Sequence, residues 1–286
     1  MINPEDYKEP SCKVCSNNFY NPQSDEPDGR IPISRVIEKL DEFLFKEDYA
    51  AADNLLTYWQ QEAESLKDYS GELTVLSEMM GLYRRTNNKD KGLWSVDRGF
   101  ELVKQHNLDG LVSTATIYLN GATTLKHFGK PRQAIEWYQK VMEVYKKNVD
   151  PYDYNMAGLC NNMALAYAEV KEYEIAEEKY KQALDIMLRL SEKSKDKLLE
   201  AAITLVNMAY LYFEWSDFTD CVQKTLSCMD KAYEYFTDKD VPLNGYYAFC
   251  CSKSIPAFKF FGYESKTEHL EKLIEKAREN ERNWTC

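Results

Sequence analysis

The sequence has no hydrophobic run that is long enough to cross a membrane. Its longest nearly apolar stretch, Ala201 to Phe213, spans 13 residues and is interrupted by Asn207, whereas a membrane-spanning helix needs about 20 apolar residues. The first 30 residues are polar and contain no apolar signal-peptide core. We therefore expect a cytoplasmic protein that has no membrane partner.

Positive charge is in short supply. The chain has 36 Lys and Arg against 47 Asp and Glu, a formal net charge of -11 at pH 7. Nucleic acids and anionic lipid surfaces select basic proteins, because binding neutralises phosphate groups. This balance argues against a nucleic-acid partner and leaves a protein or a peptide as the expected partner.

The residue patterns of conventional catalysis are scarce. The three histidines, His106, His127 and His269, lie far apart, and none has a carboxylate or cysteine at catalytic spacing. The chain has no glycine-rich phosphate loop. We therefore predict no enzymatic activity, no cofactor and no metal site.

Cysteine makes up 8 of the 286 residues, and disulfides are not required. Cys12 and Cys15 form a Cys-x-x-Cys, which would suit half of a tetrahedral zinc site. Because no second Cys-x-x-Cys or histidine pair follows, two reduced thiols are favoured, and whether this pair binds a metal stays open.

Proline divides the chain into two parts. Five of the nine prolines lie within the first 32 residues, separated by Asn, Ser, Asp and Gly, so residues 1–31 read as an extended, proline-rich lead-in. From Ile33 onward, apolar residues recur three and four apart without strand-like alternation. The pattern predicts an all-α protein over residues 32–286.

One segment shows how these helices are organised. The stretch from Cys160 to Leu184 reads CNNMALAYAEVKEYEIAEEKYKQAL. When Ala157 is counted as position 1, small residues occupy positions 8 and 20, and tyrosines occupy positions 11, 17 and 24: Ala164, Ala176, Tyr167, Tyr173 and Tyr180. Small residues let two helices of a hairpin approach closely, and aromatic residues fill the space around the contact. This pattern resembles the tetratricopeptide repeat (TPR).

The same template fits six places along the chain. Position 8 falls at intervals of 41 to 45 residues, at Leu40, Gly81, Ala122, Ala164, Ala209 and Ser254. These intervals exceed the usual repeat of about 34 residues and are similar to those of kinesin light chains. The resemblance implies a right-handed α-solenoid of about six TPR-like helix pairs, closed by a capping helix over Thr267–Arg282. Pro256 falls within the first helix of the sixth pair and predicts that this helix is kinked or short.

Three consecutive repeats carry an asparagine at position 6, namely Asn120, Asn162 and Asn207. In the repeat family this position faces the concave groove and often holds an asparagine that bonds the backbone of an extended peptide. The resemblance therefore implies a peptide-binding role for these three residues, for the neighbouring Asn161, and for Tyr210 at position 9. In the alternative interpretation, these amides bond adjacent helices and set the register of the superhelix.

Charge varies between the repeats. Basic residues, including Arg85 and Lys126, gather at the ends of the first helices in repeats two and three, and acidic residues occupy the matching places in repeats four and five. Because equivalent turns stack in a solenoid, this predicts an edge that runs from basic to acidic and adds both cations to the candidate peptide site. Charges scattered by chance are the alternative.

Two classes of function remain. The first is a non-enzymatic interaction scaffold that holds an extended peptide or a partner helix in the concave groove. The second is a regulatory receptor that senses a peptide through the same groove. Such receptors carry an added helical output domain, for which residues 1–31 are too short. The scaffold is therefore the favoured hypothesis.

Overall fold

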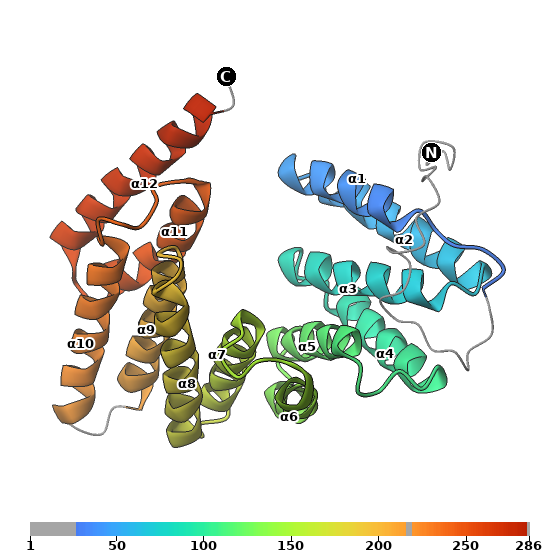
Figure 1. Ribbon diagram of the computed structural model, residues 1–286, viewed down its shortest axis with the longest axis horizontal. Helices are drawn as coiled ribbons and strands as arrows, with labels where there is room; N and C mark the ends of the chain where they lie inside the picture. Colours follow the sequence, from blue (N-terminus) through green and yellow to red (C-terminus); the bar gives the residue numbers. More distant parts are fainter. Residues whose placement is uncertain (1–26, 216–218, 285–286) are drawn as a thin grey trace. The chain divides into compact units, whose positions relative to one another are not determined.

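The computed structural model describes residues 27–215 and 219–284, and all regular secondary structure in these ranges is helical. The twelve helices follow one another as antiparallel pairs (Figure 1). The chain divides into two compact units, of which unit 1 ends at Asn148 and unit 2 begins at Val149. The predicted all-α, TPR-like solenoid fold is confirmed.

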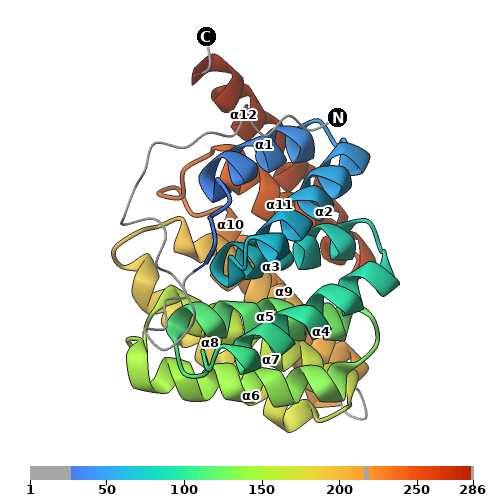
Figure 2. The same cartoon turned by 90° about the vertical axis from the view of Figure 1, so that its right-hand side faces the viewer.

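Unit 1 holds α1 to α6, with bounds Ile33–Phe45, Tyr49–Ser65, Tyr69–Arg85, Lys89–Gln105, Val112–His127 and Pro131–Asn148. Unit 2 holds α7 to α12, with bounds Tyr154–Glu169, Tyr173–Ser191, Lys197–Glu214, Thr219–Phe236, Gly245–Phe260 and Glu264–Trp284. Within unit 1 the first helices α3 and α5 lie side by side (Figures 1 and 2). Within unit 2, α9 lies between α7 and α11.

Short turns set the helix boundaries. Asp48, Asp68 and Asn88 each accept a hydrogen bond from the backbone N–H three residues later, which caps the start of the following helix. The residue just before each of these caps adopts positive φ, as Lys67 does at 53°. The left-handed backbone conformation of this residue ends one helix and turns the chain back, so the next helix packs antiparallel to the preceding one.

The repeat template correctly locates fully buried small residues in repeats three and four. The alanines at positions 8 and 20 of both repeats have no exposed surface: Ala122, Ala134, Ala164 and Ala176. Gly81 differs, because a Cβ there would meet only the Arg84 side chain at 4.0 Å. The close approach between α4 and α5 is at Gly121, where a Cβ would lie 2.4 Å from the Phe100 ring.

The described end of the proline-rich lead-in packs on unit 1. The N–H of Ile31 donates to Asp68 Oδ2 at 3.0 Å, and the N–H of Asp28 donates to the Leu66 carbonyl at 2.9 Å. The Ile31 side chain is buried. Cys12 and Cys15 lie outside the described residues.

The sequence predicts a kinked or short helix at Pro256; the expected shortening is wrong, and the kink stays a prediction. Helix α11 runs through Pro256 and ends at Phe260, so it is as long as α5 and α7, at 16 residues. Proline removes the N–H that would bond the Ser252 carbonyl. Because Pro256 is exposed, water can reach this side of the helix and satisfy the carbonyl.

Helix α12 covers the end of unit 2. It buries Leu270, Ile274 and Ala277, which share one stripe, and packs along α11. Across the described ranges, no helix has the length and apolar character of a membrane span. The same ranges contain no group of three His, Cys, Asp or Glu side chains that could hold a metal ion.

Candidate functional site

The first helices α7 and α9 of unit 2 each keep one narrow face partly accessible. In the middle of α7, half-buried residues recur every three or four positions between buried ones, and α9 repeats the pattern. We call this surface the α7–α9 face, and its residues are Gly158, Asn162, Leu165, Ile203, Asn207 and Tyr210. It contains three of the predicted site residues.

Asn162 and Asn207 occupy equivalent positions on these two helices. Both are half-buried, and within the described residues neither amide has a hydrogen-bond partner. An amide offers a donor and an acceptor together, so it can bond both the C=O and the N–H of another backbone. The neighbouring Gly158 adds room, because a Cβ there would meet nothing within 4 Å.

Asn161, which precedes Asn162, is already bonded within unit 2. Its Nδ2 donates to Thr204 Oγ1 on α9 at 3.0 Å, and the Thr204 hydroxyl donates to the Glu200 carbonyl at 2.9 Å. The Asn161 Oδ1 atom is buried, and no described residue bonds it. This arrangement links α7 to α9, as the register-setting interpretation of the asparagines expects.

Tyr210 lies at the C-terminal end of the α7–α9 face, within a group of aromatic rings. Its ring centroid is 5.8 Å from that of Phe260 and 5.2 Å from that of Phe261. Phe213, one turn later on α9, packs edge-to-face on Phe260, and these two phenylalanines remain 49% and 55% exposed. Burial raises the pKa of Tyr210, so its hydroxyl stays protonated.

The N-terminal ends of the first helices in unit 2 meet at Glu200. Tyr246 at the start of α11 donates its hydroxyl to the Glu200 carboxylate. Burial, together with the charge of Glu200, raises the pKa of Tyr154 at the start of α7 to about 12. The neutral tyrosine hydroxyls lie beside the Glu200 carboxylate at the edge of the α7–α9 face, so this carboxylate already has partners within unit 2.

The remaining predicted site residues belong to unit 1. Asn120 Nδ2 donates to Ser77 Oγ on α3 at 2.7 Å, and its backbone carbonyl accepts from Arg84 Nη1 at 3.2 Å. Arg85 is exposed at the end of α3, and Lys126 is half-buried near the end of α5. Asn120 therefore joins two first helices, as Asn161 does, whereas Asn162 and Asn207 do not.

Sequence reasoning missed two groups of residues in unit 2. The aromatic group around Tyr210 includes Phe213, Phe260 and Phe261, and a solvent-open hollow lies between α11 and α12. A signal for the first was present, because the phenylalanines end two consecutive first helices. The hollow could not be found from the repeat template, since it depends on the capping helix.

Comparisons with known proteins agree with this architecture. Residues 113–189 match the family model of the tetratricopeptide repeat. No curated protein sequence gives a match.

Three solved structures of low sequence identity share the fold. The crystal structure of BtubC (BKLC) from P. vanneervenii is 22% identical, covers 71% of this chain and 79% of its own, and has a TM-score of 0.62. A putative kinesin light chain from Podosopora anserina with nearly identical TPR-like repeats is 12% identical, with 72% and 94% coverage and a TM-score of 0.52. The apo form of the quorum sensor NprR from B. thuringiensis is 17% identical, with 86% and 64% coverage and a TM-score of 0.53.

At these identities the structural matches speak for the fold alone. Together with the family match and the twelve paired helices, they confirm the resemblance that the sequence predicted. Residues 113–189 match the tetratricopeptide repeat family, and the chain has a TPR-like solenoid fold with long repeats similar to those of kinesin light chains.

Proposed function

We propose that this protein is a non-enzymatic interaction scaffold in which unit 2 binds an extended segment of a partner protein across the α7–α9 face. One observation carries the proposal: Asn162 and Asn207 hold equivalent positions on adjacent first helices, and neither amide has a partner within the described residues. In this proposal each amide pairs with one peptide unit of the bound segment.

The spacing of these helices fits an extended chain. Axes of packed helices lie roughly 10 Å apart, and an extended backbone advances about 3.3 Å per residue. A segment that crosses α7 and α9 would then place about three residues between the peptide units held by Asn162 and Asn207. Gly158 leaves space for a backbone to lie close to α7, and the half-buried Leu165 offers an apolar contact to the same segment.

The exposed aromatic rings suit a side chain of the same segment. Phe213 and Phe260 are about half exposed beside Tyr210, and an apolar side chain that covered them would be removed from water. The bound segment is therefore proposed to carry an apolar residue at the end that lies over the C-terminus of α9.

Arg85 and Lys126 enter the proposal as steering charges, because both lie in unit 1. Replacing either with Glu should slow association with an acidic partner and leave the dissociation rate nearly unchanged, and the effect should shrink as salt rises. Stopped-flow association rates at two salt concentrations measure this. Equal rates for wild type and both variants would remove these two residues from the proposed site.

The proposal is tested by selecting binders from a library of 12-residue peptides on the immobilised full chain. Asn162→Ala and Asn207→Ala should each weaken the selected peptide by about fivefold, which corresponds to about 1 kcal/mol. Neither should change the melting temperature, since these amides have no hydrogen-bond partner in the part of the chain that the structure describes. Asn120→Ala is the matched control and should leave the affinity unchanged.

Peptide sensing is the second candidate, because NprR, which is a quorum sensor, shares this fold. A sensor must transmit the binding event beyond the groove. Hydrogen exchange with and without the selected peptide separates the two functions. Altered protection in unit 1 would favour the sensor, whereas protection confined to unit 2 would favour the scaffold.

A further inference from the structure

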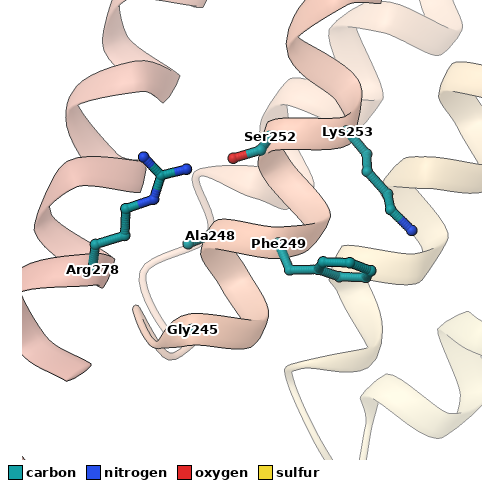
Figure 3. Close-up of a pocket in the computed structure, with 6 residues that line it drawn as sticks. All are labelled: Gly245, Ala248, Phe249, Ser252, Lys253 and Arg278. Atoms are coloured by element: carbon teal, nitrogen blue, oxygen red, sulfur yellow. The ribbon is translucent and has the colours of Figure 1, made fainter. Parts of the chain in front are cut away.

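A hollow of about 440 Å³ opens to solvent between α11 and α12 in unit 2 (Figure 3). Its lining combines an apolar wall with polar and cationic groups, contributed by Gly245, Ala248, Phe249, Ser252, Lys253 and Arg278. Two of these side chains are cationic and none is acidic, although the whole chain has 11 more acidic than basic residues. The residues that line the hollow therefore include two cations and no carboxylate.

The cationic groups are arranged around the apolar wall. Arg278 reaches from α12 toward the Ser252 hydroxyl on α11, as Figure 3 shows. On the other side of the hollow, Lys253 Nζ lies 3.9 Å from the centroid of the Phe249 ring, which is 56% exposed. An arginine guanidinium has five donors in a planar fork that matches a carboxylate, and a hydroxyl can add another donor.

We propose that this hollow binds a carboxylate on an apolar stem, with Arg278 and Ser252 donating to the carboxylate and Phe249 packing on the stem. Charge complementarity selects the anion, and the planar fork of Arg278 favours a carboxylate. Lys253 supplies a second positive charge that attracts the ligand from solvent.

This inference rests on the proposed function in one respect: the carboxylate is expected to come from the segment that unit 2 is proposed to bind. Ser252 holds the template position on α11 that Asn162 and Asn207 hold on α7 and α9. A segment bound along these first helices would bring either an acidic side chain or its own C-terminus to the hollow. Both sources present the same chemistry, so the experiment must distinguish them.

Three small probes test the site on the full chain by ¹H–¹⁵N NMR titration. N-acetyl-leucine carries a terminal carboxylate, N-acetyl-glutamate α-amide carries a side-chain carboxylate, and N-acetyl-leucinamide has the size of the first probe without its charge. Each carboxylate that fits should shift the amide signals of Gly245–Lys253 with a dissociation constant of about 1 mM. N-acetyl-leucinamide should bind at least about tenfold more weakly, because it cannot form the charged hydrogen bonds. Whichever carboxylate binds more tightly identifies the source.

Variants assign the binding to named side chains. Arg278→Gln should weaken the tighter probe by about tenfold or more, and Ser252→Ala by a few-fold. Lys259→Gln is the matched control, because Lys259 lies on the same helix and pairs with Glu271 instead of lining the hollow. If Arg278→Gln unfolds, the double variant Ser252→Ala/Lys253→Gln replaces it and should show a similar loss.

Equal affinity for N-acetyl-leucinamide, or full affinity in Arg278→Gln, would overturn the proposed carboxylate site. The failure of the peptide proposal gives a different result. In that case the carboxylate probes still bind in an Arg278-dependent way, and only the selected peptides are insensitive to Asn162→Ala.

Discussion

The Asn161 side chain on α7 donates a 3.0 Å hydrogen bond to the Thr204 hydroxyl on α9, while the amide of its neighbour Asn162 has no partner within the described residues. Two adjacent asparagines thus have different environments. The first joins two helices, and the second makes no such bond within the described residues. The bond of Asn161 fits the register-setting interpretation, whereas peptide binding by Asn162 stays a prediction.

The helix-joining asparagines should contribute to stability. Asn120→Ala removes the 2.7 Å bond to Ser77 and should lower the free energy of unfolding by about 1 kcal/mol. Asn161→Ala should cost less, because it also removes a buried Oδ1 that no residue in the described ranges bonds. Urea denaturation of both variants measures the difference. A larger loss for Asn161→Ala than for Asn120→Ala would contradict this interpretation.

A buried ion pair in unit 1 should contribute more to the free energy of unfolding than the asparagine hydrogen bonds do. Arg98 Nε donates to Glu72 Oε1 at 2.8 Å, and the Glu72 side chain is only 3% exposed. Arg98→Met leaves this carboxylate with Gln60 as a neutral partner and should destabilise the protein by about 2–3 kcal/mol. Lys231→Gln, which breaks an exposed pair with Glu234, should change stability by less than about 0.5 kcal/mol. Similar denaturation midpoints for the two variants would show that the buried pair stabilises the protein no more than the exposed pair does.

Two turn residues form a matched pair for testing backbone strain. Gly129 has φ of 79° and Lys171 has φ of 63°, so both lie in the left-handed region. Gly129→Ala should destabilise the protein by about 1 kcal/mol through conformation alone, since a Cβ there meets no atom within 4 Å. Lys171→Gly should stabilise it by up to about 0.5 kcal/mol. A higher melting temperature for Gly129→Ala and a lower one for Lys171→Gly would show that the turns are not strained.

The described cysteines should be chemically inert in the folded protein. Burial is the main cause that raises the pKa of Cys228 to about 11 and that of Cys251 to about 12. DTNB reacts with the thiolate form of cysteine. At about pH 8, Cys228 and Cys251 should therefore not react with DTNB until denaturant is added. A variant with serine at positions 12, 15 and 286 isolates the five buried thiols. Rapid labelling of this variant without denaturant would contradict the packing described.

The same thiols imply a pH dependence of stability. Their pKa values in the folded state exceed the unfolded value of about 8.5, so the folded state holds these protons more tightly. The stability that they contribute is present below about pH 8.5 and is lost as the pH rises toward 11. Replacing Cys228 with Ala should therefore flatten the decline of the urea midpoint across this range.

The repeat pattern predicted most of the fold because it is a packing pattern. Alanines such as Ala164 and Ala176 are spaced where two helices touch, and this spacing is visible in one sequence. The environment of each asparagine could not be predicted in this way. Asn161 is bonded because Thr204 lies 43 residues later on another helix, and the repeat template does not specify which neighbours face each other. The hollow near Arg278 depends likewise on how α12 packs on α11.

The central claim is that Asn162 and Asn207 hold the backbone of an extended partner segment. The most direct measurement replaces the N–H of each residue in a selected peptide, one at a time, with an ester oxygen and records the affinity for the full chain. The account predicts two sensitive positions about three residues apart, each weakened about fivefold. Sensitivity at one position should disappear in Asn162→Ala and at the other in Asn207→Ala. A peptide with no sensitive position, or with sensitivity that persists in both variants, would contradict the claim.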